Sequence, residues 1–420
     1  MTTPSDSDHE SPQASNEAAE STSVTIDRAV SSNPSALSVE AKKTTPTWRL
    51  GLNAIISLYL FLSAINILGA GLKTFQKSSD FMERIFQLGE NPILALMGGV
   101  IATAIVQSSS VTTSIIIGLV AYDQMELSTA IFAVMGANVG TSITNNLVSL
   151  GTVRFKRQFR RAYTAALMHG NVNLLTVAIL FPLEWITGAM HVDGLGWLTR
   201  FSVWLSDLLG MKPISSGSSP VKFMTKPVVD AVEWFGGLVT TTTFWEGLLV
   251  AGIGLITIFI TLGLLVMNLK GALLSRIEGL FSSHLFRTDL RAGMVGMFST
   301  FMVQSSSVTT SLMVPLAGAG AVKLNRVFPF MLGCNIGTTL TGVLAASANP
   351  AAAAVAVAIC HVLFNVIGCV MWYPARALPM GFAHWYARLA AKSKWYYFLY
   401  IFVVFVLIPC LAYFVSMLFV

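Results

Sequence analysis

Eight stretches of this chain contain no aspartate, glutamate, lysine or arginine, and each is long enough to cross a lipid bilayer. They are residues 50–72, 91–122, 127–150, 162–182, 247–269, 292–322, 327–375 and 395–420. A bilayer core of ~30 Å needs about 20 apolar residues per helix. Most of these windows therefore predict one span each, and those at 91–122 and 292–322 are long enough for a helical hairpin. The chain is expected to be an all-α polytopic membrane protein.

The low charge of the chain excludes several classes of protein. Charged residues make up 11% of the sequence, whereas about 25% is usual for soluble domains. The net charge of +6 is not gathered into basic stripes, so the sequence does not indicate nucleic-acid binding. Residues 1–44 are polar and acidic, and we expect a disordered cytoplasmic tail. No short apolar region with a cleavage site precedes residue 50, so no removable signal peptide is expected.

The sequence contains an internal repeat. Gln107–Ser114 recurs unchanged as Gln304–Ser311, 197 positions later. At the same offset, Gly136–Thr141 corresponds to Gly333–Thr338. Two separated blocks in one register predict a duplicated unit.

The charges of one connecting loop predict that the two copies have opposite topology. Residues 154–161 contain four arginines and one lysine, whereas the corresponding loop at 345–354 has no charge. Lys and Arg accumulate in short cytoplasmic loops, so the same loop is expected inside in one copy and outside in the other. This arrangement predicts two inverted repeats, as in many secondary transporters.

The expected organisation follows from these spans. The segments are a tail (1–44), a first inverted repeat (45–182), an extracellular connection with room for interfacial helices (183–243), a second inverted repeat (244–373) and an interfacial segment with a last transmembrane helix (374–420). Counting spans places the N-terminus in the cytoplasm and the C-terminus outside.

The middle of each hairpin window is polar. Irregular backbone is not tolerated against lipid, so the two tips are expected to face protein or water. The helix that returns from each tip would present free N–H groups and a positive dipole end, which favour an anion. Helix capping by the serines is the alternative. The candidate anion ligands are Gln107, Ser108, Ser109, Ser110, Gln304, Ser305, Ser306 and Ser307, with Thr112 and Thr309 beside them.

Two Gly-x-Asn-x-Gly-Thr blocks interrupt apolar windows. Paired glycines weaken a helix, so each block predicts an unwound helix. Asn138, Thr141, Asn335 and Thr338 carry oxygens of the kind that a hard cation prefers. A simple packing site is the alternative.

His169 and Asn173 are four residues apart and share one helix face, as do His361 and Asn365. Such histidines often form hydrogen bonds across a helix bundle. No cysteine or carboxylate accompanies either histidine, so zinc is not expected.

Neither polar cluster contains a charged residue. Neutral groups alone hold a divalent anion weakly in a low dielectric. The missing positive charge is therefore expected to arrive with the substrate, and sodium ions at the neutral oxygens would supply it.

In these motifs the chain resembles the type II sodium-dependent phosphate cotransporters. The resemblance includes the loop Phe159–Ala162 and the segment Pro182–Glu184, and it covers about residues 45–420. It implies sodium-driven import of inorganic phosphate, mainly HPO4 2-, by an elevator-like unit that contains both hairpins. It also implies that the Gln-Ser-Ser-Ser tips bind phosphate, and that Asn173, Thr338 and Thr341 lie at sodium positions.

The sequence departs from this family pattern at two positions. Gly170 follows His169, as in the electroneutral members, whereas members that move net charge have aspartate there. This implies two sodium ions per phosphate. Cys334 stands where serine is commoner. The family pattern places both termini in the cytoplasm, against the span count.

The expected function is a symporter in the cell membrane. Its partners are inorganic phosphate, sodium and the lipid bilayer, with no cofactor, no metal besides sodium and no nucleic acid; a homodimer is left open. A transporter of sulfate or a dicarboxylate is the nearest alternative, and a channel is another. An intramembrane serine hydrolase with a histidine base is less favoured, because no Gly-x-Ser-x-Gly motif and no orienting acid is present.

Overall fold

The computed structural model describes residues 47–76, 91–209, 220–240, 242–280, 286–349 and 351–417. The chain divides into two units, Met1–Arg49 and Leu50–Val420, and everything below concerns the second. The predicted tail at 1–44 lies outside the described residues. Within the described ranges, every regular element is a helix, as the sequence predicts.

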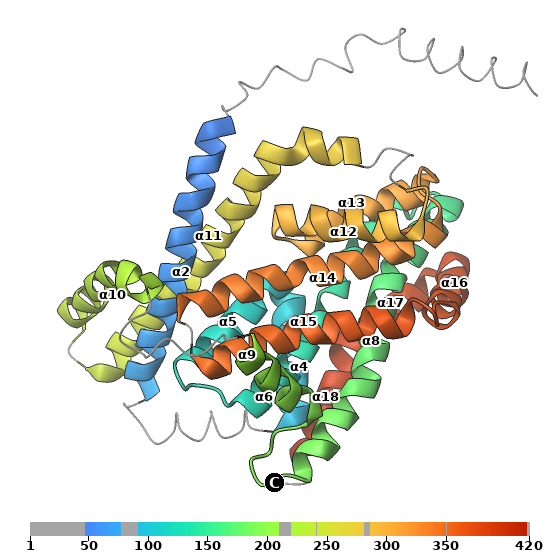
Figure 1. Cartoon of the computed structure of the whole chain (residues 1–420). Coiled ribbons are helices and arrows are strands. Elements are labelled where there is room, and N and C mark those ends of the chain that lie inside the picture. The colour runs from blue at the N-terminus through green and yellow to red at the C-terminus, as the bar shows by residue number, and fades with distance from the viewer. Residues whose placement is uncertain are drawn as a thin grey trace, which may run out of the picture. The chain divides into compact units, whose positions relative to one another are not determined.

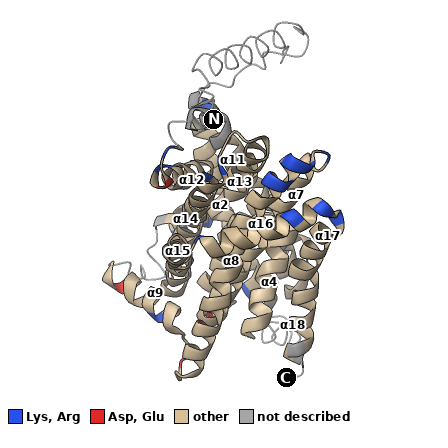
Figure 2. Ribbon diagram, turned by 90° about the vertical axis from the view of Figure 1, so that its right-hand side faces the viewer, with Lys and Arg blue, Asp and Glu red and all other residues tan. Residues whose placement is uncertain are grey.

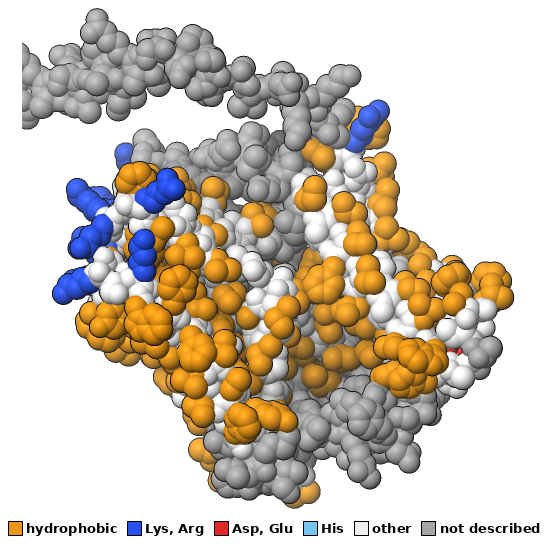
Figure 3. All heavy atoms as spheres, turned by 180° about the vertical axis from the view of Figure 1, so that it is seen from behind, with side chains coloured by type: hydrophobic (Ala, Val, Ile, Leu, Met, Phe, Trp, Pro, Cys, Tyr) orange, Lys and Arg blue, Asp and Glu red, His pale blue; other side chains and the backbone are white. Residues whose placement is uncertain are grey.

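Seven helices in this part of the chain are long and apolar enough to cross a membrane. They are α2 (Thr47–Gln76), α6 (Leu127–Gly140) with α7 (Ser142–Ser149), α8 (Lys156–Ala189), α11 (Thr243–Leu280), α14 (Leu324–Ala348), α15 (Ala352–Trp372), and α17 (Lys394–Phe402), which continues through a π-helical turn (Val403–Leu407) into α18 (Ile408–Met417). Large apolar side chains are exposed on many of them, and hydrophobic atoms cover much of the face drawn in Figure 3. A surface of this kind suits lipid rather than water.

Both windows predicted as hairpins form two short helices joined by a tight turn. The first contains α4 (Pro92–Val106) and α5 (Ser109–Ala121), and the second contains α12 (Asp289–Val303) and α13 (Ser306–Ala319). Each helix has 15 residues or fewer, whereas about 20 are needed to span a bilayer core. In Figure 1, α12 and α13 lie side by side. The polar tips therefore lie at the turns between helices that are too short to cross alone.

The predicted unwinding at the glycine blocks is wrong. Helix α14 runs without a break from Leu324 to Ala348, and Thr141 between α6 and α7 keeps a helical φ of -56° and ψ of -29°. The glycines instead allow close packing. A Cβ on Gly136 would lie 1.9 Å from the Leu96 carbonyl oxygen of α4, and one on Gly333 would lie 1.9 Å from the Gly293 carbonyl oxygen of α12. Only glycine permits two helix backbones to approach this closely.

The remaining helices lie in the segments expected to connect and follow the repeats. They are α9 (Trp197–Leu208), α10 (Pro220–Val239) and α16 (Ala377–Lys392), whereas the 3-10 turn Leu150–Thr152 lies within the first repeat, between α7 and α8. The arginine-rich loop is shorter than expected from the sequence, because Lys156 already begins α8.

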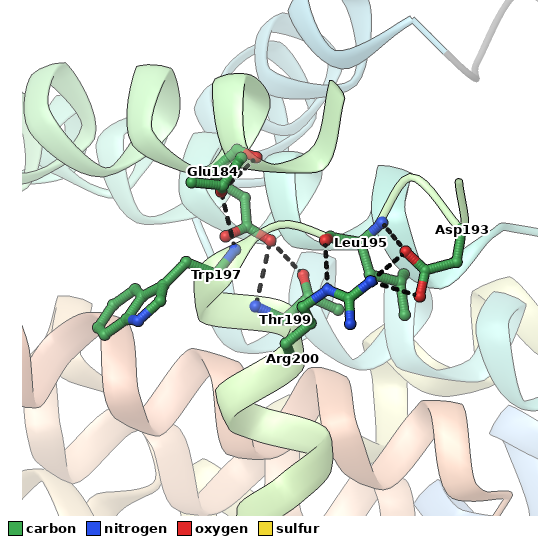
Figure 4. Close-up of polar contacts among 7 residues, drawn as sticks. Glu184, Asp193, Leu195, Trp197, Thr199 and Arg200 are labelled. Atoms are coloured by element: carbon green, nitrogen blue, oxygen red, sulfur yellow. Dashed lines mark hydrogen bonds and ion pairs between the residues drawn. The ribbon is translucent and has the colours of Figure 1, made fainter. Parts of the chain in front are cut away.

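A buried carboxylate fixes α9 against α8. Glu184 is 2% exposed, and its side-chain oxygens accept hydrogen bonds from the backbone N–H groups of Leu198 (2.6 Å) and Thr199 (3.1 Å) and from the Thr199 hydroxyl. Figure 4 shows this carboxylate at the start of α9, with the exposed ion pair of Asp193 and Arg200 nearby. A negative charge at a helix N-terminus is stabilised by the free N–H groups there. Glu184 therefore has a structural role.

Candidate functional site

The two hairpin tips lie next to each other, although they are 197 positions apart in the sequence. Ser307 Oγ donates a hydrogen bond to the Gln107 carbonyl oxygen at 3.3 Å. Thr338 of α14 lies between the tips: its Oγ1 is 3.4 Å from Ser110 Oγ, and it accepts a hydrogen bond from Ser306 Oγ at 3.4 Å. Both repeats therefore contribute hydroxyl groups to one cluster.

The two tips have the same local geometry. Gln107 and Gln304 each adopt a φ of 56° and a ψ of 25°, a left-handed conformation that few residues other than glycine adopt. Ser108 and Ser305 cap α5 and α13 by accepting from the N–H groups of Val111 (3.3 Å) and Val308 (3.4 Å). Capping thus explains these two serines, but not the following two serines of each tip. The N-termini of α5 and α13, with their free N–H groups, are both at this cluster.

The glutamines of the two tips differ in environment. Gln304 is 6% exposed, its Oε1 accepts from Thr341 Oγ1 at 3.0 Å, and its Nε2 donates to the Phe301 carbonyl at 2.7 Å. Gln107 has an exposed side chain. The Thr112 and Thr309 hydroxyls donate to the carbonyls of Ser108 and Ser305 within their own helices. Thr341 is thus joined to the tip cluster, and Thr112 and Thr309 stabilise the first helical turns.

A second polar cluster is built around His169 of α8. Asn145 Nδ2 contacts His169 Nδ1 at 3.2 Å, and Thr310 Oγ1 donates to Asn145 Oδ1 at 2.8 Å. Because an amide nitrogen only donates, His169 Nδ1 accepts and its proton is on Nε2. His169 Nε2 is 2.7 Å from Asn335 Oδ1, to which it then donates.

The same chain of hydrogen bonds continues through three asparagines. Asn335 Nδ2 donates to Asn173 Oδ1 at 2.6 Å, and Asn173 Nδ2 donates to the Asn138 carbonyl oxygen at 2.8 Å. All three side chains are at most 5% exposed. The predicted residues Asn138, Asn173 and Asn335 therefore meet in one buried network that joins both repeats.

The residues around His361 make fewer contacts. Asn365 Nδ2 donates to the His361 carbonyl oxygen at 2.9 Å and to Asn138 Oδ1 at 3.4 Å. Both ring nitrogens of His361 are buried and have no hydrogen-bond partner among the described residues.

Thr141 and Gly170 do not join either cluster through their side chains. Thr141 Oγ1 donates to the Ala137 carbonyl at 3.0 Å, within its own helix turn. Gly170 packs against α7, where a Cβ on it would lie 3.0 Å from Ser142 Cβ.

Asn145 and Thr310 are not among the candidate site residues predicted from the sequence. Thr310 lies inside the repeated octet, and Asn145 follows Asn138 by seven residues, a spacing that places both asparagines on one face of a helix. This spacing is the signal that was available. Within the described ranges, no group of three or more His, Cys, Asp or Glu side chains could hold a metal ion.

Comparison with known proteins assigns the chain to a family. The model described as Na+/Pi-cotransporter matches residues 60–191 and 258–384, more than half of the chain. The chain belongs to the Na+/Pi-cotransporter family. Each matched segment of this family member contains one Gln-Ser-Ser-Ser tip and one of the two buried histidines.

Several relatives of this family member are named as transporters. The sodium-dependent phosphate transport protein 2A of Rattus norvegicus is 31% identical over 424 residues, which cover 86% of this chain and 66% of the relative. The sodium-dependent phosphate transport protein 2B of Homo sapiens is 30% identical over 435 residues, which cover 84% of this chain and 63% of the relative. The chain thus spans just under two thirds of the length of these relatives. No solved structure matches it.

Proposed function

We propose that this protein is a symporter that imports inorganic phosphate, mainly HPO4 2-, together with sodium. The observation that carries this proposal is the meeting of the two hairpin tips at Thr338. Hydroxyl groups and two helix N-termini surround one point, and such an arrangement favours an anion. Family membership and the named relatives support the choice of phosphate and sodium.

Phosphate binds at the tips in this proposal. Ser109, Ser110, Ser306 and Ser307 donate hydroxyl hydrogen bonds, and the first backbone N–H groups of α5 and α13 point to the same place. Ser108 and Ser305 hold the helix ends in position as caps. Gln107 and Gln304 complete the two tips, the latter through its bond to Thr341.

Sodium binds at neutral oxygens close to the phosphate. Thr338 and Thr341 adjoin the tips, while Asn138, Asn173 and Asn335 form the buried network behind them. Bringing a dianion into a low dielectric is costly unless positive charge accompanies it. With Gly170 rather than an acid beside His169, we propose two sodium ions per phosphate and electroneutral transport. Thr141 is the weakest of the proposed ligands, because its hydroxyl is used within its helix.

The transport unit is proposed to consist of two inverted repeats, 45–182 and 244–373, that move in an elevator-like manner. The repeated tips and the equivalent packing of α4 on α6 and of α12 on α14 support the duplication. The connection 183–243 is proposed to be extracellular and 374–420 to end in the last membrane helix. The protein would lie in the cell membrane with its N-terminus in the cytoplasm.

Uptake into proteoliposomes tests this proposal. Purified protein is reconstituted, and uptake of radiolabelled phosphate is measured with an inward sodium gradient or with choline in place of sodium. Uptake should require sodium and should resist an excess of sulfate or succinate. Equal uptake in sodium and choline would contradict the coupling, and stronger competition by sulfate or succinate than by phosphate would favour the alternative substrates.

The contacts of His169 do not favour its use as the base of a hydrolase. Its two ring nitrogens bind Asn145 and Asn335, so neither is available to activate a hairpin serine as a general base.

A further inference from the structure

Basic side chains from two distant segments line one cavity of about 350 Å³. Arg157, Arg160 and Arg161 come from the first turns of α8, and Arg388 comes from α16. The cavity is completed by Thr164, Leu324 and His384. Figure 2 shows Lys and Arg near α7 and near α17, the elements that adjoin these two segments in the chain, and Figure 3 shows Lys and Arg gathered together on one part of the face it draws.

Most of this positive charge is not neutralised by the protein. In the part of the chain that the structure describes, Arg157, Arg160 and Arg388 form no ion pair. Arg161 has a structural contact, because its Nε donates to the Ala317 carbonyl oxygen at 2.9 Å, near the end of α13. No carboxylate lines the cavity.

The imidazole of His384 lies close enough to two of these arginines to be affected by their charge. Burial lowers the pKa of its imidazole, and the positive charges of Arg388 and Arg160 lower the pKa further. Two guanidinium groups from different helices therefore act on one side chain at the cavity wall.

The rule that places Lys and Arg in cytoplasmic loops does not explain this arrangement by itself. That rule concerns how many basic residues a loop has, not where their side chains point. Here guanidinium groups from α8 and α16 face the same space, where they repel one another. A bound anion would remove this repulsion.

We propose that this cavity binds the phosphate group of a lipid headgroup or a free phosphate ion, at a site separate from the hairpin tips. One guanidinium group can donate two parallel hydrogen bonds to two oxygens of the same phosphate. This geometry favours phosphate over a small monovalent anion.

The location of the cavity suits a lipid headgroup. It lies at the end of a helix long enough to span the membrane, and basic pockets between such helices bind anionic headgroups. On α16, Phe382 and Trp385 are 42% and 54% exposed, and aromatic side chains of this kind concentrate at the level of the headgroups.

Binding to the full-length protein in nanodiscs tests the proposal. In one arm, phosphatidylcholine nanodiscs contain phosphatidylinositol 4-phosphate, and the retained lipid is counted by native mass spectrometry. In the other arm, nanodiscs contain phosphatidylcholine alone, and inorganic phosphate binding is followed by phosphorus NMR in sodium-free buffer. The test variant is Arg160→Gln with Arg388→Gln. The matched control is Arg154→Gln with Lys392→Gln, which removes two charges from exposed positions outside the cavity.

Loss of two charge-assisted contacts should weaken binding by about tenfold or more in the test variant and little in the control. Loss in the lipid arm alone identifies a headgroup site, and loss in the phosphate arm alone identifies a free phosphate site. Arg160→Lys with Arg388→Lys keeps the charge and the fold, and should give intermediate affinity. Equal binding by the original protein, the glutamine variant and the control would overturn the proposal. The cavity contains no hairpin serine, so this result is independent of the proposed transport activity.

Discussion

The two buried histidines occupy corresponding positions in the two repeats but have different surroundings. His169 is bound on both ring nitrogens, by Asn145 and Asn335. His361 has no partner on either nitrogen among the described residues. Gly342 explains part of this difference, because it corresponds to Asn145 at the offset of 197. A Cβ on Gly342 would lie 3.4 Å from His361 Nδ1. An asparagine at position 342 would therefore be close to His361, as Asn145 is close to His169, but glycine has no side chain to form this bond.

The corresponding threonine hydroxyl groups of the two hairpins also differ, because one has a partner from another helix and the other has none among the described residues. Thr310 Oγ1 donates to Asn145, whereas its counterpart Thr113 Oγ1 is buried without a partner in the described part of the chain. The tips are thus alike in both repeats, while only the first repeat supplies an amide that ties the opposite hairpin to a histidine. The tip geometry is therefore present in both repeats, whereas the hydrogen-bond network behind the tips is present in the first repeat alone among the described residues.

Removal of Asn145 should cause the largest change, a loss of stability, because it removes the amide that distinguishes the first repeat. Asn145→Ala leaves His169 Nδ1 buried without a partner, whereas Thr310 Oγ1 keeps its hydrogen bond to the Ser306 carbonyl oxygen at 2.8 Å. The free energy of unfolding should therefore fall by roughly 1–3 kcal/mol. Thermal unfolding of the purified protein measures this. Asn268→Ala is the control, because in the described part of the chain its side chain makes one long contact, of 3.5 Å, with Ser57 Oγ. Equal stability of the two variants would show that the Asn145 bridge contributes nothing.

A charge beside the better-connected histidine should change the electrical character of transport. Gly170→Asp places a carboxylate next to α7, where the nearest hydroxyl is Ser142 Oγ, 3.2 Å from the added Cβ. One more negative charge beside His169 should bind one more positive charge, so sodium-driven phosphate uptake should produce a current. Gly170→Asn is the neutral control. Normal phosphate uptake by the aspartate variant without a current would contradict the proposed role of position 170 in electroneutral transport.

The tips are expected to respond alike, because their geometry is the same. Ser109→Ala and Ser306→Ala replace corresponding serines of the two tips, and each removes one hydroxyl group that we propose as a phosphate ligand. The KM for phosphate should rise roughly 3- to 10-fold in both variants. Ser114→Ala is the control, since its hydroxyl donates to the Ser110 carbonyl within the helix. An unchanged KM in both tip variants would contradict the ligand assignment.

An amide side chain at position 342 should cause the smallest change, and it should raise the stability of the protein rather than lower it. In Gly342→Asn the new amide can bridge Thr113 and His361, so the free energy of unfolding should rise by about 1 kcal/mol. Ile117 Cδ1, 3.3 Å from the added Cβ, must move slightly. Gly342→Ala adds the Cβ and a higher helix propensity but no amide, so asparagine should be the more stable of the two variants only when the bridge forms. If alanine and asparagine unfold at the same temperature, the missing bridge is not what distinguishes the two repeats.

The sequence predicted the parts of the fold that depend on local patterns. Charge-free windows identified the apolar helices, and the polar centres of two windows located the hairpin turns at Gln107 and Gln304. The glycine blocks were misread, because a pair of glycines either unwinds a helix or allows another helix to pack closely. Only the position of α4 beside α6 decides which of these occurs.

The sequence by itself determined the helical membrane fold and the duplicated serine tips, because bilayer thickness and chain reversal constrain residues that are close in the chain. Tertiary structure alone decided that the tips meet at Thr338, that Asn145 binds His169, and that Glu184 caps α9. Each of these contacts joins different helices. Helix packing determines which side chains lie within hydrogen-bonding distance of each other. The residue pattern of one helix does not determine its distance from another helix.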